Sequence, residues 1–223
     1  MKIEEILNTV IQGDCLEIMK QLPDKCIDLV LTDPPYGVDY VGGQNERERE
    51  RLQNDKDANV YEWLFKEIKR VLKDDGSAYV FYANGKENKI FPFIDCKYQV
   101  LIWNKQNKGF GDIASRYHHT YEPFIYLSKS SPTNWYGGTQ EVDVWVTRGL
   151  YNNEFHPTQK HPNIISRMIT NSTKEGDVVL DPFLGSGTTA LQCKQLGRKY
   201  IGIEISEKYC KIANDRLRQD ILI

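Results

Sequence analysis

The chain has 223 residues, 40% of them hydrophobic and 27% charged, and its formal net charge is −2. This length predicts one well-packed domain over residues 1–223 and is too short for two domains of ordinary size. The composition excludes a disordered chain. No apolar run approaches the roughly 18 residues of a membrane-spanning helix, and the acidic N-terminus is unlike a secretory signal. We therefore expect neither membrane insertion nor secretion.

The five cysteines and the uneven charge narrow the function classes further. The cysteines are odd in number and form no Cys-x-x-Cys pair, which argues against a disulfide scaffold and a zinc site. We predict no metal and a cytoplasmic, reducing environment. The negative net charge counts mildly against a nucleic-acid binder, which is usually basic. Residues 97–129, however, carry five bases against two acids, a local excess that could meet phosphates.

Short apolar runs followed by turns predict the strands of a sheet that is buried on both faces. In chain order these runs are residues 27–31, 77–83, 178–180 and 199–205. A helix with Trp63, Leu64 and Ile68 on its apolar face is predicted before the second run. Helices that begin at Thr188 and Ser206 are predicted after the third and fourth runs.

Strands that alternate with helices of about 10–15 residues predict an α/β fold with a doubly wound, mostly parallel sheet. Residues 99–103 and 122–128 are expected to form an antiparallel pair at the sheet edge. Residues 42–57 are densely charged and are predicted to form a mobile loop. Residues 128–155 are rich in Gly, Pro and Ser and are predicted to be an irregular insertion.

The sequence DPFLGSGTT places a glycine turn after the third predicted strand. Ligands of open α/β sheets bind at the carboxyl ends of the strands, and Gly185 and Gly187 would let the backbone approach a ligand closely. Glu204 ends the next strand, where a carboxylate can accept hydrogen bonds from both ribose hydroxyls. The turn lacks the third glycine of the dinucleotide fingerprint. These features predict an adenosine-containing ligand and make a pyrophosphate less favoured.

The sequence DPPYG, after the first predicted strand, carries a more specific signal. Two consecutive prolines fix the backbone and remove two amide donors, which leaves carbonyl groups pointing outward. The carboxylate of Asp33, the carbonyl of Pro34 and the ring of Tyr36 then supply two acceptors and a stacking surface. This combination suits a planar ligand that bears an NH₂ group. A rigid turn capped by Asp33 is the structural alternative.

With these two motifs, the sequence resembles the amino-methyltransferase family of DNA methyltransferases. The resemblance is to the permuted (beta) class, in which the catalytic DPPY precedes the cofactor-binding FxGxG. Four segments match in the order of that class: GDCLEIMKQLP with Asp14, TDPPYG at residues 32–37, HPTQK at residues 156–160, and LDPFLGSGTT with Glu204. One departure is His161, which stands between Lys160 and the proline that often follows this lysine in the family.

The resemblance implies a Rossmann-like methyltransferase fold and transfer of a methyl group from S-adenosyl-L-methionine to N6 of a flipped-out adenine. The catalytic residues would be Asp33, Pro34, Pro35 and Tyr36. The residues expected to bind the cofactor are Asp14, Cys15, Asp33, His156, Thr158, Gln159, Lys160, Asp181, Pro182, Phe183, Gly185, Ser186, Gly187, Thr188 and Glu204. The residues expected to contact DNA are Lys105, Lys108, Arg116 and His118.

The resemblance also implies double-stranded DNA as the substrate and a bacterium or bacteriophage as the source. Residues 128–155 would form a small target-recognition insertion. From its position directly after DPPYG and its alternating Glu and Arg residues, we also expect the loop at residues 42–57 to close over the flipped base. A homodimer and a partner restriction enzyme both stay open.

The nearest alternative function is cytosine-N4 methylation on the same fold. In that group the tetrapeptide more often starts with Ser, so Asp33 favours adenine. A protein or RNA methyltransferase fits the HPTQK element and the permuted order less well. A dinucleotide-dependent oxidoreductase is opposed by the missing third glycine. A non-enzymatic DNA-binding subunit is opposed by the presence of every expected site residue.

Overall fold

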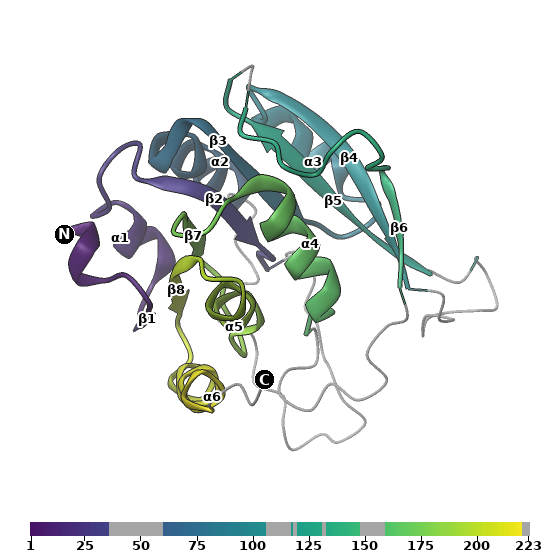
Figure 1. Ribbon diagram of the computed structural model, residues 1–223. Helices are drawn as coiled ribbons and strands as arrows, with labels where there is room; N and C mark the ends of the chain where they lie inside the picture. The colour runs from purple at the N-terminus through teal and green to yellow at the C-terminus, as the bar shows by residue number, and fades with distance from the viewer. Residues whose placement is uncertain (36–59, 106–116, 118–119, 131–132, 148–158, 220–223) are drawn as a thin grey trace.

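The computed structural model of the chain describes residues 1–35, 60–105, 117, 120–130, 133–147 and 159–219. One sheet of eight strands runs through these residues in the order β1-β8-β7-β2-β3-β5-β4-β6 (Figure 1). The strands are β1 (Thr9–Gln12), β2 (Ile27–Thr32), β3 (Leu72–Phe81), β4 (Lys97–Asn104), β5 (Tyr121–Ser128), β6 (Val144–Val146), β7 (Val178–Asp181) and β8 (Lys199–Glu204).

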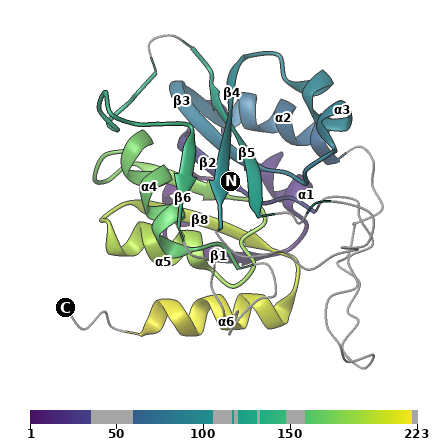
Figure 2. The ribbon, with the colours of Figure 1, turned by 90° about the vertical axis from the view of Figure 1, so that its right-hand side faces the viewer.

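Among the described residues, neighbouring strands run parallel except where β5 meets β3 and β4. The predicted mostly parallel sheet with an antiparallel strand is therefore confirmed, and so is the pairing of β4 with β5. This pair does not lie at the sheet edge, however, because β6 adds outside β4 with Trp145 opposite Trp103 (Figure 2). Strand β3 begins earlier than predicted, at Leu72, and its ladder with β2 is irregular before Ser77.

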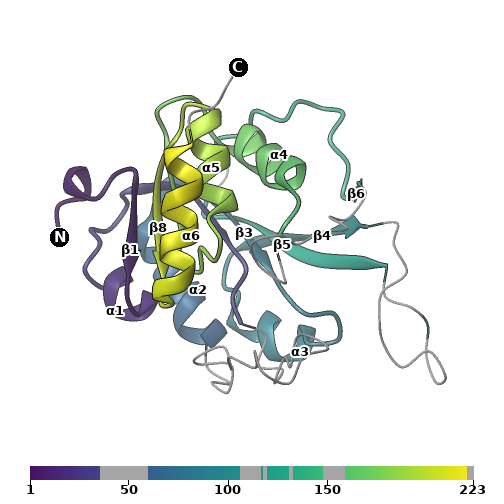
Figure 3. The same cartoon turned by 90° about the horizontal axis from the view of Figure 1, so that it is seen from below.

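Helices cover both faces of the sheet, as a doubly wound fold requires. One face carries α1 (Cys15–Met19), α2 (Val60–Val71), α3 (Glu87–Ile90) and the short 3₁₀ turn η2 (Phe91–Phe93), whereas α4 (Pro162–Ser172), α5 (Thr188–Gln195) and α6 (Glu207–Arg218) lie on the other (Figure 3). A further turn, η1 (Ile3–Glu5), precedes β1. Because side chains alternate along a strand, Val30 of β2 packs in the cluster beneath α2, and Leu29 and Leu31 pack in the cluster beneath α4 and α5.

The chain leaves the adjacent strands β2 and β7 in opposite directions. After β2 it passes through α2 to β3 on one side, and after β7 it passes through α5 to β8 on the other side. Such a reversal opens a crevice at the carboxyl ends of the two strands, which is where open α/β sheets bind ligands. Asp33 directly follows β2, and Asp181 ends β7. The topology therefore brings both predicted motifs to this crevice.

Several elements were not predicted from the sequence, namely strands β1 and β6, helices α1, α3 and α4, and the turns η1 and η2. Strands β1 and β6 have four and three residues, and each lies at an edge of the sheet, so their apolar patterns are too short to detect. Helix α4 had a readable signal, because Ile164, Ile165, Met168 and Ile169 recur at helical spacing and are all buried. Strand β6 also shows that the predicted irregular insertion at residues 128–155 contains regular structure. The loop at residues 42–57 lies outside the described residues.

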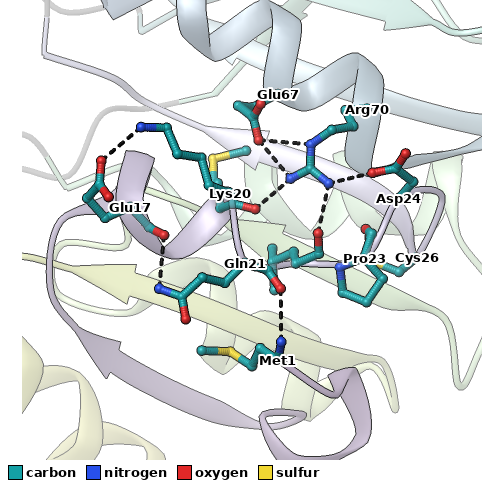
Figure 4. A network of polar contacts seen from close by, with 11 residues as sticks. Met1, Glu17, Lys20, Gln21, Pro23, Asp24, Cys26, Glu67 and Arg70 are labelled. Atoms are coloured by element: carbon teal, nitrogen blue, oxygen red, sulfur yellow. Dashed lines mark hydrogen bonds and ion pairs between the residues drawn. The ribbon is translucent and has the colours of Figure 1, made fainter.

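Arg70 of α2 joins helix α1 to the segment that leads into β2 (Figure 4). Its guanidinium donates to the backbone oxygen of Met19 at 2.6 Å and of Leu22 at 2.7 Å. It also contacts the carboxylates of Asp24 at 2.6 Å and Glu67 at 2.7 Å. Helix α1 has five residues, so its last carbonyl groups lack intrahelical partners. Arg70 supplies them and thereby fixes the path into β2.

Replacing Arg70 with Met should lower the free energy of unfolding by about 2–3 kcal/mol, because buried carbonyl groups would lose charged donors. Urea unfolding followed by circular dichroism measures this. The control is Lys211→Ala, which removes an exposed pair with Asp215 and should leave the unfolding midpoint nearly unchanged. Equal unfolding midpoints for Arg70→Met and the wild type would contradict the anchoring role.

Candidate active site

The carboxyl ends of four adjacent parallel strands carry one acidic residue each. Asp14 lies just beyond β1, Glu204 ends β8, Asp181 ends β7, and Asp33 follows β2. These residues come from both ends of the chain, and the sheet places them side by side along one edge. The sequence predicted all four as site residues, and the structure brings all four together.

Asp14 caps the first helix. Its side chain accepts hydrogen bonds from the backbone amides of Leu16 at 2.9 Å and Glu17 at 3.2 Å, which are typical N-cap contacts. Cys15 follows it, and burial, assisted by the charge of Asp14, raises the pKa of its thiol to about 12. A thiol with that pKa stays protonated and unreactive near neutral pH. Cys15 is therefore a packing residue at this edge.

Glu204 holds the glycine turn. Its Oε2 accepts from the backbone amide of Gly185 at 2.8 Å, and its Oε1 accepts from that of Ser206 at 2.8 Å. Gly187 begins α5 with a φ of 85°, and a Cβ atom there would lie 2.8 Å from the Cβ of Ala213. Only glycine avoids both the strained φ and this contact. The turn is thus fixed from one side by Glu204 and from the other by α6.

Asp181 and Ser186 anchor the two ends of the DPFLGS segment. The Oδ1 of Asp181 accepts from the backbone amide of Phe183 at 3.1 Å. Burial, with the nearby charges of Asp33 and Glu204, raises the pKa of Asp181 to about 7. The buried guanidinium of Arg216 donates to the backbone oxygen of Ser186 at 2.5 Å. These contacts explain how a glycine-containing segment holds one conformation.

Asp33 belongs to a chain of alternating charges. Lys160 donates to its Oδ2 and also lies 3.4 Å from Oε2 of Glu122. The other oxygen of Glu122 accepts from Lys105. Burial alone would raise the pKa of Glu122, but Lys160 and Lys105 outweigh burial and lower it. Burial alone would lower the pKa of Lys160, but Asp33 and Glu122 outweigh burial and raise it. Glu122 and Lys160 therefore stabilise each other's charged forms.

Sequence reasoning missed Glu122. Glu122 was predicted as the first residue of a strand but was not assigned to the site, because an isolated acid beside an apolar run has no recognisable spacing. It joins the site because β5 is antiparallel, so the beginning of β5 lies where the neighbouring strands end. The pairing of Trp103 in β4 with Glu122 also places Lys105 beside it.

His161 explains the departure from the family pattern. It is the N-cap of α4, where its Nδ1 accepts from the backbone amide of Asn163 at 3.2 Å. Burial lowers the pKa of this imidazole, which favours the neutral form that can accept a hydrogen bond. Pro162 then occupies the first turn, a position that suits proline. The inserted histidine therefore serves as the cap of the helix that follows Lys160.

The predicted site residues divide into three groups. Those that the structure describes are Asp14, Cys15, Asp33, Pro34, Pro35, Gln159, Lys160, Asp181, Pro182, Phe183, Gly185, Ser186, Gly187, Thr188 and Glu204. Those outside the described residues are Tyr36, Lys108, Arg116, His118, His156 and Thr158. Lys105, predicted to contact DNA, is engaged with Glu122, and Lys129 of the same basic stretch donates to the backbone oxygen of Leu72. Part of the local positive charge is thus used within the fold.

In the described part of the chain, no group of three or more His, Cys, Asp or Glu side chains is arranged to hold a metal ion. None of the helices described is long and apolar enough to cross a membrane.

Comparison with known protein families gives the assignment. The family model for N6/N4 methyltransferases, described as DNA methylase, matches residues 27–215. The chain belongs to this family. The resemblance seen in the motifs is thereby confirmed, and with it the expectation that the protein is a methyltransferase.

Characterised relatives of this DNA methylase are similar over most of the chain. The type II methyltransferase M.HinfI of Haemophilus influenzae is 33% identical, with 97% of this chain and 70% of the relative covered. The DNA adenine methyltransferase YhdJ of Escherichia coli (strain K12) is 32% identical, with 94% and 82% covered. The type II methyltransferase M2.DpnII of Streptococcus pneumoniae is 27% identical, with 95% and 90% covered.

Solved structures share the fold. The crystal structure of M1.HpyAVI with SAM is 26% identical with a TM-score of 0.71, and 95% of this chain and 99% of that chain are covered. The cytosine-N4-specific PvuII DNA methyltransferase is 20% identical with a TM-score of 0.76, and 96% and 87% are covered. The second likeness concerns the fold alone.

Replacing Asp181 with Asn should stabilise the protein at pH 8 by roughly 2–4 kcal/mol, since one pKa unit corresponds to about 1.4 kcal/mol. The raised pKa of Asp181, about 7, means that the folded protein keeps a proton that the unfolded chain releases near pH 4. This residue therefore makes the fold less stable as the pH rises from about 4 to 7. Urea unfolding at pH 4, 6 and 8 should show the gain growing with pH. A gain that is constant over this range would contradict the assignment.

Proposed function

We propose that this DNA methylase transfers the methyl group of S-adenosyl-L-methionine to N6 of adenine in double-stranded DNA. The observation that carries the proposal is the placement of Asp33 and Glu204 at the ends of β2 and β8, with only β7 between them. One carboxylate can accept from an amino group and the other from ribose hydroxyls. The name of YhdJ, a DNA adenine methyltransferase that is 32% identical, supports adenine as the target base.

The glycine turn and Glu204 fit the adenosine end of the cofactor. Each oxygen of Glu204 accepts one backbone amide, from Gly185 or Ser206, and a carboxylate oxygen can accept a second hydrogen bond. The two backbone contacts therefore orient the carboxylate and leave acceptor capacity for two ribose hydroxyls. Thr32 Oγ1 and Gln159 Oε1 are buried without partners among the described residues. Buried polar atoms normally have partners, so these two fit a site that takes up a polar ligand.

Asp33 and the Pro34 carbonyl would prepare the amino group for reaction. The nitrogen of an adenine amino group is a poor nucleophile because its lone pair is delocalised into the ring. Two acceptors, each taking one N–H, localise the lone pair and aim it at the electrophile. S-adenosyl-L-methionine, when bound, supplies a methyl group on a sulfonium. The acceptors hold the nitrogen more strongly as it becomes positive, so they stabilise the transition state more than the ground state.

The target base must leave the duplex to reach this crevice, because a base stacked in a DNA duplex cannot enter a crevice at the end of a sheet. Tyr36 of the DPPY motif would stack on the extruded base and return about 1–3 kcal/mol, the scale of aromatic–base stacking. Residues 128–155 remain our candidate for target recognition. We also propose a restriction enzyme of the same sequence specificity as a partner, because two relatives are named type II methyltransferases. A homodimer stays a prediction.

The target base is tested by identifying the product. The protein is incubated with labelled S-adenosyl-L-methionine and DNA of mixed sequence, and the DNA is digested to nucleosides. We expect the label in N6-methyl-2′-deoxyadenosine. Label in N4-methylcytosine would overturn the adenine assignment and favour the alternative left open by the sequence. DNA that stays unlabelled under all conditions would overturn the proposed activity.

Two substitutions should separate chemistry from binding. Asp33→Ala should abolish methyl transfer and leave most of the cofactor affinity, because the carboxylate is assigned to the amino group. Glu204→Ala should weaken cofactor binding by about 1–3 kcal/mol, the cost of unmet hydrogen bonds. Calorimetry measures the affinity, and methyl incorporation measures the transfer. Full turnover by Asp33→Ala would remove Asp33 from the mechanism, and unchanged affinity in Glu204→Ala would mean that the ribose is held elsewhere.

A further inference from the structure

We propose that Lys160 and Glu122 are positioning residues that orient the carboxylate of Asp33 for the adenine amino group. This inference rests on the proposed function, in which Asp33 accepts from that group. It differs from the role that the family resemblance implied for Lys160, which was contact with the cofactor. The structure places the ammonium of Lys160 beside the two carboxylates of Asp33 and Glu122.

Three separate elements meet at Lys160. Asp33 comes directly after β2, Glu122 comes from β5, and Lys160 lies just before α4. The residue is 8% exposed, and its ammonium lies 4.8 Å from the centroid of the Phe81 ring. An aromatic face attracts a cation and excludes water from it. Lys160 is thus a buried cation whose position is fixed on three sides.

A buried ammonium is costly to desolvate and persists only where its partners are well placed. Lys160 donates to Oδ2 of Asp33, which fixes the rotation of the carboxylate plane. Asp181, at the end of the neighbouring strand β7, also interacts electrostatically with Asp33. Above pH 7, where Asp181 carries a charge, the cation of Lys160 offsets the repulsion between these two carboxylates. An ionised Asp33 is an acceptor only, which is what the proposed reaction needs.

Glu122 is a second carboxylate beside Lys160. It is itself balanced by Lys105, whose ammonium also lies 4.8 Å from the centroid of the Trp103 ring. The four charges alternate in sign and sum to zero. Glu122 therefore shares with Asp33 the stabilisation of the charged Lys160. A carboxylate can accept several hydrogen bonds, so Asp33 can also accept one from a substrate. Glu122 acts through Lys160 and need not touch the base.

The experiment measures kcat against pH, with DNA and S-adenosyl-L-methionine saturating, for the wild type, Lys160→Met, Lys160→Arg and the double variant Lys160→Met with Glu122→Gln. For Lys160→Met we expect kcat to fall about 100-fold, the scale of a small misplacement in an active site. The pH at which kcat falls on the acid side of the profile (the acid limb) should rise by roughly one to three pH units, the scale of losing an adjacent opposite charge. Adding Glu122→Gln should move the limb back, because it removes a second carboxylate, and Lys160→Arg should keep the limb near its wild-type position.

The matched control is Lys73→Met. Lys73 lies 2.7 Å from Oδ1 of the buried Asp28, at the opposite end of the same strand β2. This variant also breaks a lysine–aspartate pair on β2, so it should lower stability. It should leave the acid limb unchanged, because Asp28 lies away from the carboxyl ends of the strands. A shift of the limb in Lys73→Met as large as in Lys160→Met would reduce the effect to a general loss of stability and overturn the inference.

A second readout does not depend on activity. Lys160 lowers the pKa of Glu122 in the wild type, so this pairing adds stability that is present above pH 5 and lost at lower pH. Without Lys160, burial disfavours the ionised carboxylates as the pH rises. The drop in Tm caused by Lys160→Met should therefore be larger at pH 8 than at pH 4. An equal drop at both pH values would contradict the ionic coupling.

The outcomes separate this inference from the proposed function. If the wild type methylates adenine and Lys160→Met changes only the affinity for S-adenosyl-L-methionine, measured by calorimetry, then Lys160 is a cofactor contact and the inference alone fails. If the wild type transfers no methyl group to adenine, the proposed function fails. Reduced kcat, a displaced acid limb and unchanged cofactor affinity in Lys160→Met, with partial recovery in the double variant, support the positioning role.

Discussion

Burial of the central strands on both faces is the constraint that organises this protein. Every residue of β2, from Ile27 to Thr32, is buried, and helices lie above and below the sheet (Figure 3). A polar side chain has little room along such a strand, so ligand-binding groups gather where the strands end. The parallel direction of β1, β8, β7 and β2 puts those ends at one edge. The site is a consequence of strand direction and burial together.

Four neighbouring carboxylates along one sheet edge repel one another, and each has a different environment that reduces this repulsion. The negative charge of Asp14 is stabilised by the backbone amides at the N-terminus of α1. Glu204 accepts from two backbone amides. Asp181 has its pKa raised to about 7 by burial, so it can shed its charge. Asp33 pairs with Lys160. The acid assigned to catalysis is the one balanced by a full cationic side chain.

The antiparallel direction of β5 also shapes the charge distribution at the site. Parallel strands present only their carboxyl ends at the site, whereas β5 presents its beginning there. This brings Glu122 beside Lys160, the cation that pairs with Asp33, and Lys105, which directly follows β4, pairs with Glu122. His161 contributes from the third side, because its capping of α4 fixes the backbone directly after Lys160. The electrostatics of one carboxylate therefore depend on β4, β5 and α4 at once.

The sequence by itself determined the family, the α/β class and the approximate positions of six of the eight described strands. Continuous apolar runs before DPPYG and DPFLGSGTT mark buried parallel strands, and the motifs specify backbone turns through proline and glycine, whose effects are local. Strands β1 and β6 were not predicted, because four and three residues are too few to show a recognisable strand pattern. Only the tertiary structure decided that Lys160 lies against Asp33 and Glu122, since these residues are distant in the chain and a lone charged side chain carries no local signal of its partner. Such pairings follow from which strand ends meet, and strand order is set by long-range packing.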